Sequence, residues 1–371
     1  MSVPIGFIAY GLDRAPTGIG RYSKELIAAL CRAGVNVTIL QAGKGLRGNG
    51  TIRLPGSRLL PGLLTIGQAE IAWTIRRQKV ALVHDPTGCV PLSLTGARRV
   101  ATLHDAIPYI YPETSTRLDW LIYHFWLPLA VRRLDSIITV SKRSKADILR
   151  YLPVKPENVT VIPEAAAPMY RPMNQAQIEA ALLRHGIRFP YMLYVGSIEG
   201  RKNLTRLLEA FAQVRDWSQK WKLVIVGAHK WKYAPLFDTL KQLQLTSDVH
   251  FTGYVPEEDL PALYNGASVF VFPSLYEGFG LPVLEAMACG VPVVTSNCSS
   301  LPEVAGEAAI LVDSTDVNAI AVAIRRVLEE PELAATLRAK GLARAGHYTW
   351  GRTARETIAV YEKVLGKRIT S

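Results

Sequence analysis

Short apolar runs alternate with helical patterns along this 371-residue chain, and the alternation restricts its fold more than any other feature of the sequence. In the first half, two segments repeat apolar residues every three or four positions, as amphipathic helices do: GRYSKELIAALCRAG and KRSKADILRYL. The runs around them have the length and composition of buried strands: IGFIAYG, NVTILQA, ALVHDPT, RVATLHDA, SIITVS and NVTVIPEA. Strands that alternate with helices predict a parallel, doubly wound sheet.

The second half restarts the same alternation. Its predicted strands are YMLYVGS, WKLVIVGA, DVHFTGYV, SVFVFPS, PVVTSN and AAILVD, and its predicted helices are LTRLLEAFAQV, APLFDTLKQLQL and AIAVAIRRVLEE. The segment PEAAAPMYRPMNQAQ, rich in proline and alanine, lies between the halves as a linker. We therefore expect an α/β protein with two Rossmann-like, doubly wound domains, residues 1–168 and 169–350, that face each other across a ligand-binding cleft. A last helical segment, residues 351–371, either caps the second domain or crosses back to the first.

The composition is that of an ordinary globular protein, with 49% hydrophobic and 20% charged residues. No segment reaches the roughly 18 uninterrupted apolar residues of a membrane span, and the first residues lack the basic region of a signal peptide. The four cysteines form no C-x-x-C pair and have no metal-ligand spacing, which predicts reduced thiols. These features predict a cytoplasmic protein without a metal site.

The net charge of +12 is concentrated in the first half of the chain. Residues 1–165 contain 21 Lys and Arg against 11 Asp and Glu, a balance of +10, and the remainder contributes only +2. Such an imbalance indicates an anionic partner for the first half: nucleic acid, an anionic membrane surface or a phosphorylated substrate. A solvated basic surface without a partner is the alternative.

The stretch SLYEGFGLPVLEAMACGVPVV places two glutamates eight positions apart between two predicted strands. Gly278 and Gly280 remove side chains at the turn, so that main-chain amides can approach a ligand. A proline suits the first turn of a helix that begins near Leu281, and the amides at such a helix start bind phosphate oxygens. Glu277 then stands at the strand tip, and Glu285 can accept hydrogen bonds from a ribose diol. A nucleotide sugar fits this pattern, although Glu285 could instead only complement the helix dipole.

The same stretch resembles the E-x7-E signature of the retaining glycosyltransferases of family 4, which have the GT-B fold. The resemblance covers essentially the whole chain, because further family motifs occur in the family's order: GLDRAPTGIGRYSKEL, TLHDAIP, TVSKRSKADI, VIPEA, YVGSIEGRKNL, LVIVGA and VHFTGYVPEEDL. GIGRYSKEL, HDAIP and GRKNL together resemble the mannosyltransferase branch that builds bacterial O-antigen and exopolysaccharide chains.

The resemblance implies roles for individual residues. Glu277 matches the glutamate beside the donor sugar, and His104 the histidine that contacts this sugar. Lys202, with Arg201 beside it, matches the lysine that neutralises the diphosphate. These four are the candidate catalytic residues. The candidate donor-binding residues are Gly18, Gly20, Ser197, Gly278, Phe279, Gly280, Leu281 and Glu285. Taken alone, the two glycines before a helix or the single histidine would more often be structural.

Two positions depart from the family pattern. Ser197 stands where many members carry arginine, and Arg201 could cover that role. Glu164 stands where relatives have the asparagine of IPNG, and we interpret it as structural. Asp105, next to the candidate histidine, is expected to orient its loop.

The implied reaction transfers a hexose, mannose above all, from a GDP-sugar or UDP-sugar with retention of configuration. Retention needs either a protein nucleophile, for which Glu277 is the candidate, or same-face attack assisted by the leaving phosphate. No Asp-x-Asp triad stands at a strand tip, so we expect no metal and no cofactor beyond the nucleotide sugar. A sugar-nucleotide epimerase of the same fold is one alternative, and a basic nucleic-acid-binding protein is another. The latter lacks a recognised binding module, so nucleic acid is not an expected partner.

The expected acceptor is a glycan or a lipid-diphosphate-linked glycan bound by the basic first domain. The segment TRLDWLIYHFWLPLAVRRL combines four aromatic residues other than histidine with three arginines. Such a segment suits an anionic bilayer surface, which predicts peripheral binding at the cytoplasmic face of the membrane. A buried core helix with a solvated basic end is the alternative interpretation.

Overall fold

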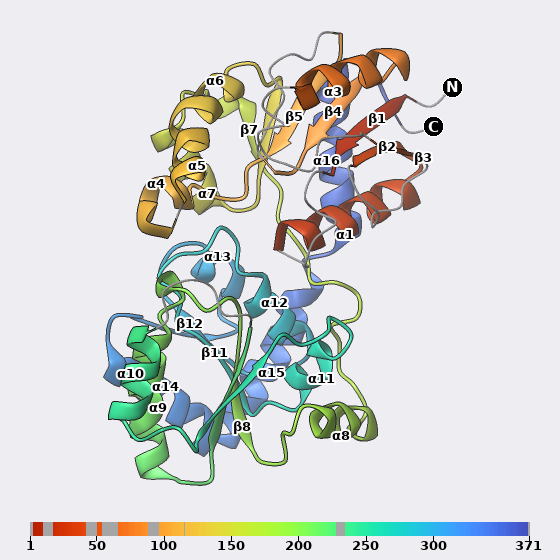
Figure 1. Ribbon diagram of the computed structural model, residues 1–371. Coiled ribbons are helices and arrows are strands. Elements are labelled where there is room, and N and C mark those ends of the chain that lie inside the picture. The colour runs from red at the N-terminus through yellow and green to blue at the C-terminus, as the bar shows by residue number, and fades with distance from the viewer. Residues whose placement is uncertain are drawn as a thin grey trace. The chain divides into compact units, whose positions relative to one another are not determined.

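The computed structural model describes residues 3–9, 18–41, 50–53, 66–87, 96–114, 116–227 and 234–369. The chain divides into two compact units (Figure 1). The first contains residues 1–164 and 349–371, and the second contains residues 165–348. Each unit is built on one parallel sheet, as the alternation of strands and helices predicts.

The sheet of the first unit has seven strands among the described residues, in the order β3-β2-β1-β4-β5-β6-β7. The strands are β1 (Pro4–Ile8), β2 (Asn36–Gln41), β3 (Gly50–Arg53), β4 (Leu82–Asp85), β5 (Arg98–Thr102), β6 (Ser136–Thr139) and β7 (Val159–Val161). The helices are α1 (Gly18–Arg32), α3 (Ile66–Arg77), α4 (Ile107–Ile110), α5 (Arg117–Leu121), α6 (Leu127–Val131), α7 (Lys142–Tyr151) and α16 (Trp350–Leu365). A π-helical turn, Ile122–Trp126, joins α5 to α6.

The sheet of the second unit has six strands in its described part, in the order β10-β9-β8-β11-β12-β13. The strands are β8 (Tyr191–Val195), β9 (Lys222–Val226), β10 (Val249–Gly253), β11 (Val269–Phe272), β12 (Val293–Ser296) and β13 (Ile310–Val312). The helices are α8 (Gln175–Arg184), α9 (Leu204–Trp217), α10 (Ala234–Gln242), α11 (Leu260–Asn265), α12 (Leu281–Ala288), α13 (Leu301–Ala305), α14 (Val317–Glu329) and α15 (Pro331–Gly346).

The strand order reverses once in each sheet, between β1 and β4 in the first unit and between β8 and β11 in the second. In doubly wound sheets, ligands bind outside the carboxyl ends of the strands at such a reversal. The strands there are continuous apolar runs because helices cover both faces of a parallel sheet. All four residues of β11, for example, are completely buried. In the second unit, the fold therefore points to the segments that follow β8 and β11.

The last helix, α16, belongs to the first unit and packs against α1 (Figure 1). It begins after Thr349, whose side chain accepts a hydrogen bond from the amide of Arg352 as an N-cap. Trp350 and Tyr361 are buried, and the Tyr361 hydroxyl lies 2.5 Å from His84 Nδ1. The hydroxyl of Thr353 donates to the carbonyl of Pro163 at 2.8 Å. The helix is thus tied to β4 and to the segment that follows β7.

The structure also contains elements that the sequence patterns missed. Strand β3 is short and polar, and helices α3 and α15 have weak apolar periodicity, so none of them stands out in the sequence. From its sequence, the segment after Thr116 could be either a membrane-binding segment or a buried core helix. It folds into α5, the π-helical turn and α6. None of the helices in the described ranges is long and apolar enough to cross a membrane.

Candidate functional site

Two segments meet at the strand reversal of the second unit. One follows β8 and contains a short 3₁₀ turn, Gly200–Lys202, and the other follows β11 and leads to α12. Asn203, in the left-handed conformation with φ of 62°, ends the turn. Its side-chain amide donates to the carbonyls of Pro273 at 3.0 Å and Ser314 at 2.6 Å. Asn203 therefore ties the turn to the segment after β11.

This arrangement brings Glu277 against two cations. Its Oε1 atom lies 2.6 Å from Lys202 Nζ and 3.1 Å from Arg201 Nη1. The hydroxyl of Ser274 donates to the same oxygen at 2.6 Å. The side chains of the three charged residues are at most 10% exposed. The structure thus unites three of the four candidate catalytic residues and adds Ser274, which the sequence analysis did not single out.

Burial and neighbouring charges shift the pKa values of Glu277 and Lys202 in opposite directions. Burial raises the pKa of Glu277, but Lys202, Arg201 and the hydrogen bond from Ser274 outweigh it and hold the pKa below its usual range. Burial also lowers the pKa of Lys202, and the neighbouring Glu277 carboxylate opposes that shift. Buried ionised groups whose pKa values are shifted by a specific partner are typical of functional sites.

Glu199 links Ser197, the remaining candidate after β8, to the cluster of Arg201, Lys202 and Glu277. Its Oε1 atom accepts from the Ser197 hydroxyl at 2.8 Å and from Arg201 Nη2 at 2.8 Å. The other amino group of the guanidinium, Nη1, also donates to the carbonyl of Tyr276. Ser197 is therefore connected to Arg201 through a shared carboxylate. No sequence pattern singled out Glu199, although it stands within the GSIEGRKN segment.

The loop after Glu277 is held by serine hydroxyls. Ser300 donates to the carbonyls of Glu277 at 2.9 Å and Phe279 at 2.7 Å. Gly280 then adopts φ of 113°, and a Cβ atom there would lie 2.7 Å from the side chain of Leu301. Only glycine fits both this conformation and this space. Helix α12 begins at Leu281, where the sequence predicts it, so the loop of Gly278 and its neighbours leads directly into the helix start.

Glu285 lies in the second turn of α12 and is 2% exposed. Its Oε2 atom accepts a hydrogen bond from the Tyr264 hydroxyl at 2.9 Å. A carboxylate has two oxygens and can accept hydrogen bonds from several donors at once. Its predicted contact with a ribose diol stays a prediction, and Tyr264 is a second residue that the sequence analysis missed.

The other candidates belong to the first unit. Gly18 and Gly20 are in the first turn of α1. His104 follows β5, and its Nδ1 atom lies 2.9 Å from Glu164 Oε1. Glu164, interpreted from sequence as structural, is thus the partner of a candidate catalytic residue. Asp105 accepts from the amide of Ile107 at 2.9 Å and so orients the loop, as expected.

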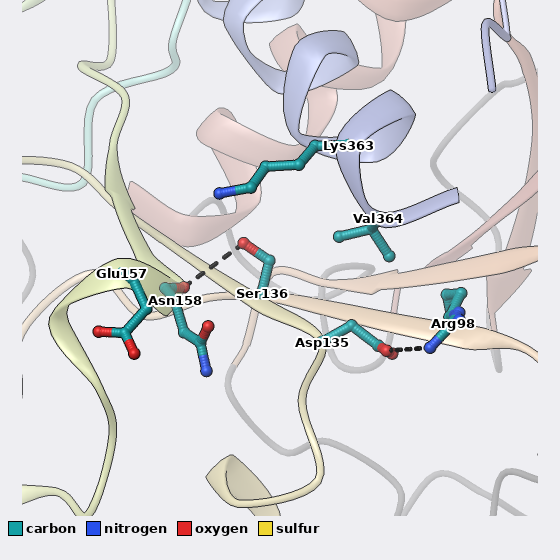
Figure 2. Close-up of a pocket in the computed structure, with 7 residues that line it drawn as sticks. All are labelled: Arg98, Asp135, Ser136, Glu157, Asn158, Lys363 and Val364. Atoms are coloured by element: carbon teal, nitrogen blue, oxygen red, sulfur yellow. Dashed lines mark hydrogen bonds and ion pairs between the residues drawn. The ribbon is translucent and has the colours of Figure 1, made fainter. Parts of the chain in front are cut away.

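A polar pocket of about 200 Å³ lies elsewhere in the first unit (Figure 2). Lys363 and Val364 of α16 lie on one side of it, and Glu157 and Asn158 lie on another. These residues and Ser136 surround the amino ends of β6 and β7. Because ligands of doubly wound sheets bind at the carboxyl ends, this pocket is not the candidate site.

Comparisons with known proteins identify the family. Residues 16–166 match the profile described as Glycosyltransferase Family 4, and residues 183–344 match that of Glycosyl transferases group 1. The O-antigen chain mannosyltransferase B of Escherichia coli is 35% identical over 293 residues, which cover 78% of this chain and 76% of that protein. This chain belongs to glycosyltransferase family 4. The MMP alpha-(1->4)-mannosyltransferase of Mycolicibacterium hassiacum is 30% identical, over 79% of this glycosyltransferase and 72% of the relative.

Solved structures show the same fold. Sucrose-phosphate synthase from Thermosynechococcus elongatus superimposes with a TM-score of 0.82 at 23% identity, over 98% of this glycosyltransferase and 99% of that chain. Anabaena HepE in complex with UDP and glucose has a TM-score of 0.81 at 17% identity, over 97% of this glycosyltransferase and 100% of that chain. The predicted GT-B fold and family are therefore confirmed. The comparisons favour neither the epimerase nor the nucleic-acid-binding alternative.

Proposed function

We propose that this glycosyltransferase transfers mannose from a nucleoside diphosphate sugar to a glycan or lipid-linked acceptor, in the synthesis of a surface polysaccharide. The buried cluster of Arg201, Lys202 and Glu277 at the carboxyl end of the second sheet carries the proposal, since it provides fixed cations for a diphosphate. The names of the two relatives support mannose as the sugar, and that of the Escherichia coli protein supports a surface polysaccharide as the product.

The proposed chemistry is electrostatic. As the bond between the sugar and the diphosphate breaks, negative charge grows on the leaving phosphate, and Arg201 and Lys202 stabilise it. The amides from Gly278 to Leu281, at the start of α12, bind the phosphate oxygens. Glu277 Oε1 is already held by three donors, which favours a positioning and electrostatic role over that of a nucleophile. We therefore propose same-face attack with retention of configuration, and no metal ion.

The donor and its base can be tested by thermal stabilisation. GDP, UDP, ADP and dTDP would be added, with and without magnesium, to the parent and to Glu285→Ala. At about 100 times its dissociation constant, a ligand adds roughly 2.7 kcal/mol of stability. We expect GDP to stabilise the parent without magnesium and to lose this effect in the variant, because the ribose diol loses its acceptor. If none of the four stabilises the parent, the proposed donor site is wrong.

The partner surface of the first unit is the segment 117–133, here called the aromatic-basic segment. Its large apolar side chains that are 42–60% exposed are Leu118, Trp120, Leu121, Phe125 and Leu129. Arg117, Arg132 and Arg133 are exposed beside them. This exposure disagrees with a fully buried core helix and suits an anionic surface, where apolar side chains insert and arginines meet lipid headgroups. We propose peripheral binding at the cytoplasmic face of a membrane.

Sedimentation with anionic vesicles tests the proposed membrane binding by the aromatic-basic segment. The parent is expected to pellet at low salt and to be released at high salt, because a Debye length shortens with ionic strength. Trp120→Ala with Phe125→Ala should reduce the bound fraction several-fold. Tyr254→Ala, which removes a 62% exposed aromatic side chain of the second unit, serves as the control and should not. Equal binding by both variants would contradict the proposed surface.

A further inference from the structure

We propose that Glu164 is a positioning residue that keeps the proton of the His104 imidazole on Nδ1. The Nε2 atom is then left as a hydrogen-bond acceptor for the donor sugar, which the family resemblance places beside His104. The statement about the sugar rests on the proposed function, whereas the statement about the proton does not.

The hydrogen bond between the two side chains fixes the proton. Glu164 Oε1 lies 2.9 Å from His104 Nδ1, and the two side chains are 5% and 14% exposed. A carboxylate can only accept hydrogen bonds, so the nitrogen that it contacts must carry the proton. In the neutral ring, Nε2 is then left with a lone pair. The identity of residue 164 therefore decides what the opposite edge of the imidazole can bind.

Both partners are held in place by their surroundings. The Tyr22 ring lies perpendicular to the imidazole, at 87° and 4.7 Å between centroids, and the Tyr22 hydroxyl is bonded to Thr102 at 3.0 Å. The Ser144 hydroxyl donates to the main-chain carbonyl of His104 at 2.9 Å. On the other side, Thr353 of α16 holds the carbonyl of the residue before Glu164. These contacts hold the His104 backbone, one side of its ring and the segment that carries Glu164 in place.

The opposite nitrogen of the ring, Nε2, is the atom that a ligand could contact. His104 Nε2 is buried and has no hydrogen-bond partner within the described ranges. A buried polar atom without a partner is costly, so a ligand that supplied a hydrogen bond to Nε2 would be favoured. A lone pair at Nε2 attracts a hydroxyl hydrogen and repels a phosphate oxygen. The Nδ1–H form of the ring therefore suits the contact with the donor sugar that the family resemblance implies for His104.

The replacement Glu164→Gln tests the role of the carboxylate with little change of shape. A glutamine amide both donates and accepts, so it imposes neither tautomer. The protonation form of His104 would be read at pH 8 from nitrogen–proton correlations in protein with ¹⁵N-labelled histidine, with His104→Gln identifying the signals. We expect Nδ1–H in the parent and a new population with Nε2–H in Glu164→Gln. Glu157→Gln, an exposed glutamate near the start of β7, is the matched control and should resemble the parent.

A proton on Nε2 of the parent, or an unchanged form in folded Glu164→Gln, would overturn the proposal whether or not the protein transfers mannose. Steady-state kinetics then tests the contact with the sugar. Glu164→Gln is expected to lower kcat/KM for the nucleotide sugar three- to tenfold, the equivalent of about one hydrogen bond, and Glu157→Gln to leave it unchanged. An altered tautomer with unaltered kcat/KM would refute the contact. A parent inactive with every nucleotide sugar would instead refute the proposed function.

Discussion

Glu277 carries the negative charge that two buried cations share. Because its folded pKa lies below the ordinary value of 4.5, its ionisation stabilises the protein above that pH. This contribution is lost as the pH falls from about 4.5 through the lower folded value. Glu277→Gln should cost about 3–5 kcal/mol at pH 7, because it removes the carboxylate that the buried Lys202 contacts and one of the two that Arg201 contacts.

Urea unfolding at several pH values would measure this effect. The deficit of Glu277→Gln relative to the parent should shrink below pH 4.5, where the parent carboxylate becomes protonated. A nucleoside diphosphate should also reduce the deficit at pH 7, since its phosphates supply the missing negative charge. Glu307→Gln is the control, because this side chain is 92% exposed and its pair with Lys340 is worth at most about 1 kcal/mol. Equal stability of Glu277→Gln and the parent at pH 7 would refute the proposed charge balance.

At the level of secondary-structure elements, the sequence predicted those strands and helices that have a clear apolar pattern or a clear start signal. The strands that line both reversals follow from continuous apolar runs, and the start of α12 follows from the glycines and the proline before it. Strand β3 was missed because an edge strand of four residues needs little apolar surface. The π-helical turn Ile122–Trp126 has no sequence signature that separates it from an α-helix.

Contacts between distant elements could not be predicted in this way. Glu164 and His104 are 60 positions apart, and their pairing depends on β5 and β7 lying on either side of β6 in one sheet. Glu199 could be noticed as a charged residue but not as the shared acceptor of Ser197 and Arg201. Periodicity thus locates the candidate site, whereas the partners of its residues are a property of the tertiary structure.

At the scale of the whole molecule, the first unit depends on a polar network that crosses its core. His84 is completely buried, with Nδ1 on the Tyr361 hydroxyl of α16 and Nε2 on Thr102 Oγ1 at 2.8 Å. Thr102 in turn bonds the Tyr22 hydroxyl of α1. The neutral imidazole donates a hydrogen bond from one ring nitrogen and accepts one at the other. Its tautomer therefore decides which of the two hydroxyl groups is the donor. The network links helices α1 and α16 to strands β4 and β5 in the centre of the sheet.

Burial of His84 should make the folded protein less stable in acid. Burial, reinforced by the nearby His104, lowers the pKa of His84 from 6.5 to about 3. Between these values the unfolded chain binds a proton that the folded protein does not. The free energy of unfolding should therefore fall with decreasing pH, by about 1.4 kcal/mol for each pH unit from this residue alone. Above pH 6.5 the term vanishes, because His84 is neutral in both states.

His84→Phe removes the titration and should flatten the pH dependence of unfolding between pH 6.5 and 4. It should also lower stability at pH 7 by about 1–3 kcal/mol, because Thr102 and Tyr361 lose a buried partner. If His84→Phe retained the full slope, the acid sensitivity would have to come from other groups. The network between α16 and the sheet would then have no part in it.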